Sequence, residues 1–129
     1  MKERYLENDY AEIWFENGIV HIVYKPGCVL NINNIKLIVQ DRLKVSAGTK
    51  GPILIDFRNL VSSDNATRSY LATPEAERYL NAGAILITNE IQRLIMNLYL
   101  KIDKPNLPAR VFTNREKALE WLEQFKYLN

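Results

Sequence analysis

The sequence contains little of the side-chain chemistry that builds disulfides or metal sites. Among its 129 residues there is one cysteine, Cys28, and one histidine, His21. A lone cysteine cannot form a disulfide within the chain, so we expect a reducing compartment and a cytoplasmic protein. His21 lacks neighbours at metal-ligand spacing, which favours a partly buried histidine in a strand. Cys28 is interpreted as a small buried side chain rather than as a nucleophile paired with His21.

Glycine is also scarce, and this limits the range of enzymes to which the chain could belong. The five glycines show neither the GxGxxG nor the GxxxxGK spacing of phosphate-binding loops, and no Gly-x-Ser-x-Gly motif occurs. The sequence also offers no clear pairing of a nucleophile with a base. We therefore expect a protein that is not an enzyme and that holds no cofactor and no metal ion.

Long apolar runs and an excess of one charge are both missing. No stretch approaches the ~18 apolar residues of a membrane-spanning helix, and the start of the chain lacks the apolar segment of a signal peptide. Lysine and arginine number 17 against 15 acidic residues, a formal net charge of +2. This balance argues against a nucleic-acid partner, and the sequence predicts no membrane span.

What the sequence does contain is a regular alternation of strand-like and helix-like segments. Two runs rich in β-branched and aromatic residues flank Asn17-Gly18, a pair typical of a tight hairpin turn. The order predicted is β-β-α-β-α-β-α-β-α, an α/β chain with a mixed sheet whose later strands are parallel. The predicted strands are 10–16, 19–25, 52–57, 83–88 and 109–113, and the last three should be neighbours. The predicted helices are 33–47, 64–72, 89–102 and 114–125.

Three stretches, "GPILIDFRNL", "AGAILIT" and "PARVFTNREKALEWL", resemble the STAS superfamily of bacterial anti-sigma-factor antagonists. The similarity is greatest to its uncharacterised SpoIIAA-like members and spans nearly all of a single domain, 1–129. It implies a four- to five-stranded sheet with helices packed mainly on one side. It also implies a non-catalytic protein-interaction or regulatory module, expected here as a homodimer with a protein partner. Some relatives have been compared with lipid-binding proteins, so the alternative is a carrier of a small apolar ligand.

The resemblance draws attention to the turn after the third strand. In the antagonists a serine there is phosphorylated to release a partner kinase, and Ser62 and Ser63 occupy the equivalent place. The Asp that precedes the switch serine in that family, and the Gly that follows it, are both missing here. The simpler interpretation, which we prefer, is that Ser63 or Asp64 caps the next helix.

Two further groups of residues are candidates for binding. Asp56 and Arg58 flank the end of the third strand, where ligands bind in parallel sheets, although such residues also serve in turns. The apolar-ligand alternative places a pocket between sheet and helices, near 57–72 and 89–100.

The helix 89–102 is the second group. It is predicted to turn Ile91, Leu94, Ile95, Leu98 and Ile102 toward the core. Met96 and Leu100, with Arg93 nearby, would then form an apolar interface on the outer side. The alternative is that the loop 104–108 covers Met96 and Leu100.

Overall fold

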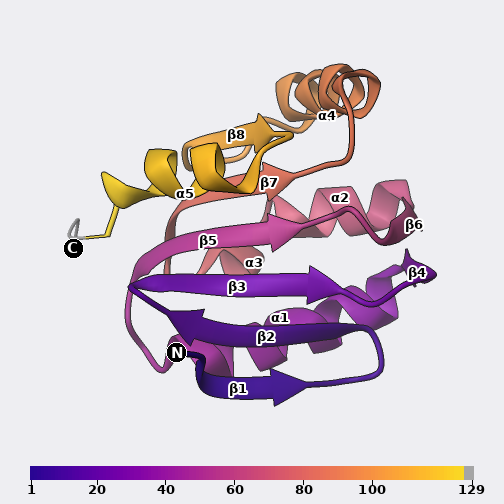
Figure 1. Ribbon diagram of the computed structural model, residues 1–129. Coiled ribbons are helices and arrows are strands. Elements are labelled where there is room, and N and C mark those ends of the chain that lie inside the picture. Colours follow the sequence, from indigo (N-terminus) through magenta and orange to yellow (C-terminus); the bar gives the residue numbers. More distant parts are fainter. Residues whose placement is uncertain (127–129) are drawn as a thin grey trace.

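The computed structural model describes residues 1–126, and a mixed sheet lies at its centre (Figure 1). In this part of the chain, six strands form one sheet in the order β1-β2-β3-β5-β7-β8, while β4 and β6 pair separately. The strands are β1 (Glu3–Glu7), β2 (Ala11–Glu16), β3 (Ile19–Tyr24), β4 (Cys28–Leu30), β5 (Gly51–Asp56), β6 (Leu60–Ser63), β7 (Leu80–Leu86) and β8 (Ala109–Phe112). The helices are α1 (Ile32–Ser46), α2 (Asn65–Leu71), α3 (Pro74–Glu77), α4 (Glu90–Asp103) and α5 (Arg115–Glu123).

The first half of the sheet is the predicted hairpin with one strand added. β2 and β3 pair antiparallel across Asn17 and Gly18, whose φ angles of 52° and 81° are the positive values that such a two-residue turn requires. β1 pairs antiparallel with β2 and forms the edge of the sheet. Its charged, largely exposed sequence is typical of an edge strand and gives little strand signal. This strand makes the sheet six-stranded instead of four- to five-stranded.

The second half of the sheet confirms the predicted neighbours. β5 pairs parallel with both β3 and β7, and β7 pairs parallel with β8. The register places Leu54 beside Ala84 and Ile85 beside Val111. All four strands therefore end at the same edge of the sheet, and the turns that follow them gather there.

The two faces of the sheet are covered unequally, as the fold prediction states. Helices α1 to α4 lie over one face, and α5 lies over the other (Figure 1). On the first face Ile13, Ile22 and Ile53 belong to the same buried core as Ile35 and Ile38 of α1. On the other face Ala118 and Leu122 of α5 join a second core that includes the strand residues Leu54, Ala84 and Leu86. Successive residues of β5 thus contribute to different cores, because side chains alternate along a strand.

A buried arginine fixes α3 against α1. Arg42 donates hydrogen bonds to the backbone carbonyls of Ala76, at 2.7 Å, and Arg78, at 2.5 Å. Burial lowers the pKa of Arg42 to about 10, so the guanidinium remains charged at neutral pH. These bonds satisfy carbonyls at the end of a four-residue helix that would otherwise be weakly anchored.

The orientation predicted for α4 is wrong. Met96 and Leu100, expected on the outside, pack against Ile85, Ile87 and Val111 of the sheet. The five residues expected in the core are instead 47–71% exposed: Ile91, Leu94, Ile95, Leu98 and Ile102. Both sides of this helix are apolar, so periodicity alone could not show which side faces the sheet. Within residues 1–126, no helix is both long and apolar enough to cross a membrane.

Candidate functional site

A cavity of about 460 Å³ lies between the sheet and helices α2, α3 and α4, where the sequence predicts a pocket. Its floor is the face of β5, β7 and β8 that points away from α5. The floor residues alternate along each strand and, apart from one glycine, are aliphatic. They are Ile53, Ile55, Gly83, Ile85, Ile87 and Ala109.

The walls of the cavity come from helices on either side of that floor. Leu71, Ala72 and Ala76 line it from α2, α3 and the turn between them. Met96 and Leu100 line it from α4, and their side chains pack on the floor. Two of the three residues predicted as an outer interface, Met96 and Leu100, are therefore part of the cavity wall. Arg93, the third of them, forms an ion pair with Glu90 at 2.7 Å on the same helix.

Three polar side chains close the gap between α2 and α4. The Arg68 guanidinium lies over the Tyr99 ring, 4.2 Å from its centroid, and its Nε is 4.0 Å from Asp103 Oδ2. Arg68 and Asp103 are each about one-quarter exposed and both line the cavity. An arginine here, partly paired and partly exposed, can contribute a charge-assisted hydrogen bond to an anionic ligand group.

A second polar contact holds the loop after α4 against α3. Asn106 donates to Glu77 from its backbone N, at 3.1 Å, and from Nδ2, at 3.0 Å. Pro105 and Leu107, on either side of Asn106, line the cavity. Glu77, Asn106 and Arg68 were not predicted as site residues from the sequence. The available signal was the spacing of Tyr99 and Asp103, four residues apart and so on one side of the helix.

The serines of the predicted switch lie at the cavity as well. Ser62 and Ser63 are exposed residues at the end of β6, and both contribute to the cavity lining. The cap of the following helix is Asp64, which accepts hydrogen bonds from Thr67 N at 2.8 Å and from Thr67 Oγ1 at 2.7 Å. These bonds lower the pKa of Asp64. Of the two cap candidates, Asp64 is therefore the one that acts, and both serine hydroxyls are left on the surface.

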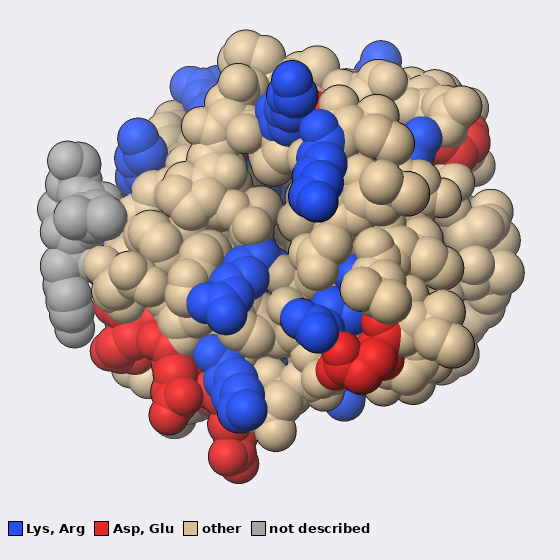
Figure 2. Space-filling view, turned by 90° about the horizontal axis from the view of Figure 1, so that it is seen from above, with Lys and Arg blue, Asp and Glu red and all other residues tan. Residues whose placement is uncertain are grey.

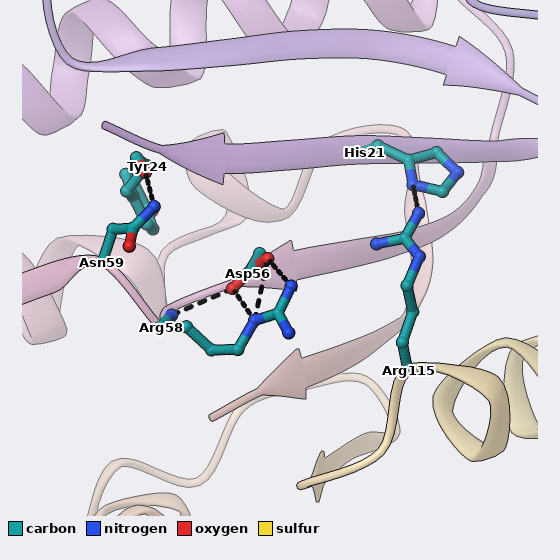
Figure 3. Close-up of polar contacts among 6 residues, drawn as sticks. All are labelled: His21, Tyr24, Asp56, Arg58, Asn59 and Arg115. Atoms are coloured by element: carbon teal, nitrogen blue, oxygen red, sulfur yellow. Dashed lines mark hydrogen bonds and ion pairs between the residues drawn. The ribbon is translucent and has the colours of Figure 1, made fainter. Parts of the chain in front are cut away.

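Asp56 and Arg58 form a closed pair on the other face of the sheet (Figure 3). The buried carboxylate of Asp56 accepts from the Arg58 backbone N at 2.9 Å, from Nε at 3.0 Å and from Nη2 at 2.8 Å. The hydrogen bond that Arg58 donates to the Asp56 carboxylate raises the pKa of Arg58. The structural interpretation of these two residues thus fits better than a ligand site. They also lie on the face opposite the cavity, because Asp56 is two residues after Leu54.

His21 is held in a buried stack on that same face. Its ring lies parallel to Trp14 with centroids 5.1 Å apart, and Arg115 Nη2 is 3.4 Å from Nδ1 (Figure 3). Because arginine only donates, Nδ1 must accept, and the neutral ring carries its proton on Nε2. Burial first, and the positive charge of Arg115 second, lower the pKa of His21 to about 4.

Cys28 lies in β4 as a buried free thiol, within the core that α1 forms with the sheet. Burial raises its pKa, which disfavours the reactive thiolate. Within residues 1–126, no group of three or more histidine, cysteine or acidic side chains is arranged to hold a metal ion.

Comparison with known proteins places this architecture in a family. A model described as a domain of unknown function, DUF7793, matches residues 13–126. The chain belongs to the DUF7793 family. Among solved structures it is similar to an uncharacterised protein of the DUF3478 family from Shewanella loihica PV-4, which has a SpoIIAA-like fold. The two are 17% identical with a TM-score of 0.62, over 91% of this chain and 98% of the other.

The DUF7793 chain therefore has the SpoIIAA-like fold that the sequence resemblance implies. Identity at this level supports the fold. A search of curated proteins gave no match.

Proposed function

We propose that this DUF7793 protein is a non-catalytic binding module whose cavity takes a small, elongated apolar ligand such as a fatty acyl chain. The observation that carries the proposal is the cavity itself. Its volume of about 460 Å³ falls in the range of about 300–1,000 Å³ that is usual for ligand sites. Its floor and walls are mainly aliphatic, so burying an apolar ligand there gains hydrophobic free energy.

Arg68 favours a ligand with one anionic end, and the two acidic residues of the lining, Glu77 and Asp103, are engaged with Asn106 and Arg68. Arg68 is the cation among the side chains that line the cavity in residues 1–126, and Asp103 pairs with it at the long distance of 4.0 Å. A carboxylate or phosphate group would bind the guanidinium more closely than Asp103 does. The aliphatic floor would then contact the remainder of the ligand.

A fluorescent fatty acid, cis-parinaric acid, tests the proposal. We expect saturable binding to the wild type and at least a tenfold weaker affinity for Ala72→Phe, whose ring would fill the cavity. Ala66→Phe is the matched control, because Ala66 is exposed on α2, the helix that precedes Ala72. Circular dichroism of each variant verifies that it folds. The proposal fails if the wild type does not bind, or if both phenylalanine variants bind equally well.

The contribution of the anionic end is tested separately. Arg68→Met should weaken binding of the fatty acid several-fold and leave the affinity for the corresponding fatty alcohol unchanged. An equal loss for both ligands would show that Arg68 supports the cavity wall and does not recognise charge.

Three observations support a non-catalytic role. The carboxylate of Asp56 is fully engaged with Arg58, and the thiol of Cys28 is buried with a raised pKa. The imidazole of His21 is stacked on Trp14 and faces an arginine. Each of these groups is thus occupied with packing or pairing and poorly placed to meet a substrate.

A second candidate function is regulation of a partner protein through the β6 turn. The observation that favours it is the exposure of Ser62 and Ser63, which leaves both hydroxyls accessible to a kinase. Ser62→Asp and Ser63→Asp, used in pull-downs from native extract, should then release a specific partner without changing the melting temperature. Retention of every partner by both variants would count against this role.

A further inference from the structure

The outer side of α4 presents an unusual amount of apolar surface. Its large aliphatic residues recur at intervals of three and four, which places them in one continuous row along the helix. We call this row the α4 stripe: Ile91, Leu94, Ile95, Leu98 and Ile102, each 47–71% exposed. Scattered exposed leucines are common in proteins, but a continuous exposed row is typical of an interaction surface.

The charges beside the stripe are arranged in a self-complementary way. Glu90 is in the first turn of α4, and Lys101 is in its last turn. They are 11 residues apart, about three helical turns, so both lie along the same border of the stripe. The acidic Glu90 thus lies at one end of this border, and the basic Lys101 lies at the other end. When two such helices pack antiparallel about a twofold axis, the two borders lie on the same side of the contact and each acid faces a base. A parallel twofold pair leaves the borders on opposite sides of the contact, so their charges do not meet.

We propose that the α4 stripe is the contact surface of a homodimer, with two α4 helices packed antiparallel about a twofold axis. In this register Ile91 lies opposite Ile102 of the second copy, and Ile95 lies opposite Leu98. Each Glu90 then approaches Lys101 of the other chain. A twofold interface requires a patch that complements itself, and the stripe with its two charged ends meets that requirement.

The charge pattern favours a second copy over a lipid surface. An interfacial helix on an anionic membrane carries basic residues on its polar side. Here Glu90 is held beside the stripe by Arg93 at 2.7 Å. Figure 2, which views the molecule from above, shows basic and acidic side chains on the same face and no uniformly basic surface. A contact built mainly on one helix is small, so the dimer should be weak and its population should depend on protein concentration.

Sedimentation equilibrium over a range of protein concentrations tests the dimer. The wild type should show a reversible monomer–dimer equilibrium, and Leu98→Lys should weaken it at least tenfold. Leu37→Lys is the matched control, because Leu37 is 45% exposed on α1, away from the stripe. A wild type that stays monomeric at every concentration would overturn the proposal. So would equal weakening by the two lysine variants.

The antiparallel orientation is tested with charges and with cysteines. Glu90→Lys and Lys101→Glu should each weaken the dimer, and the double variant should restore it, although it cannot restore the pair of Glu90 with Arg93. Oxidation should cross-link an Ile91→Cys chain to an Ile102→Cys chain more efficiently than either chain to itself. Preferential self-linkage would refute this orientation.

The wild type could instead stay monomeric and bind anionic vesicles, with Leu98→Lys abolishing that binding. This result would show that the stripe contacts a membrane, and the dimer proposal would be wrong. Failure of ligand binding to the cavity leaves this proposal intact.

Discussion

Acidification should destabilise the protein through His21. The folded-state pKa of this histidine is lowered to about 4 from an ordinary value of 6.5, because its ring is 4% exposed and faces Arg115. A folded-state pKa below the unfolded one means that the unfolded chain takes up the proton first. The contribution to stability is therefore fully present above pH 6.5 and is lost as the pH falls toward 4.

The size of the effect follows from the two pKa values. One pKa unit corresponds to about 1.4 kcal/mol, so the full difference is about 3 kcal/mol. Between pH 7 and pH 5 the unfolded histidine becomes almost fully protonated while the folded one stays largely neutral. The free energy of unfolding should fall by about 2 kcal/mol over this interval, on the order of 5–10 °C in melting temperature for a domain of this length.

Urea titrations at both pH values, on the wild type and on His21→Phe, measure this term. Phenylalanine keeps an aromatic ring beside Trp14 but cannot take a proton, so the variant should lose about 2 kcal/mol less than the wild type. Arg115→Gln should recover only part of the difference, because burial is the larger cause of the shift. Identical pH dependence in wild type and His21→Phe would refute the reasoning, as would a histidine titration by NMR centred near pH 6.5.

Four further substitutions test three local features of the fold, each by urea or thermal unfolding. Asp64→Ala should cost about 0.5–2 kcal/mol because the α2 cap is lost, whereas Ser63→Ala should leave stability unchanged; the reverse result would assign the cap to Ser63. Arg42→Met should cost about 2–4 kcal/mol, since two backbone carbonyls lose a charged donor, and an unchanged midpoint would contradict this role. Gly18→Val should cost about 1–3 kcal/mol because a β-branched residue is strained at a φ of 81°, and a neutral effect would argue against the turn geometry.

Much of the fold could be predicted because local signals and tertiary structure agree. Asn17-Gly18 specifies its turn through backbone freedom, and the parallel strands are short aliphatic runs buried on both faces. β1 could not be predicted, since an edge strand with charged side chains is stabilised by pairing with β2 rather than by its own composition. The short β4–β6 pair depends in the same way on contacts between distant segments.

The position of the candidate site in the fold could be predicted from the sequence, whereas most of its polar residues could not. A pocket between sheet and helices follows from the fold resemblance, but Arg68 and Asp103 come from different helices that only the tertiary structure brings together. The failure at α4 has another cause. The rule that the most apolar side of a helix faces the core assumes that each helix is buried only by its own chain. Ile91 and Leu98 lie on the most apolar side of α4 and are nevertheless exposed to solvent.

The attachment of α4 has a thermodynamic consequence. Each of its residues keeps some solvent exposure, and the helix lines the cavity on one side and carries the stripe on the adjacent side, with Ile95 belonging to both. A ligand and a second copy would thus act on adjacent sides of the same helix. If either moves α4, the change in affinity must be reciprocal: the factor by which the ligand alters dimerisation equals the factor by which dimerisation alters ligand binding.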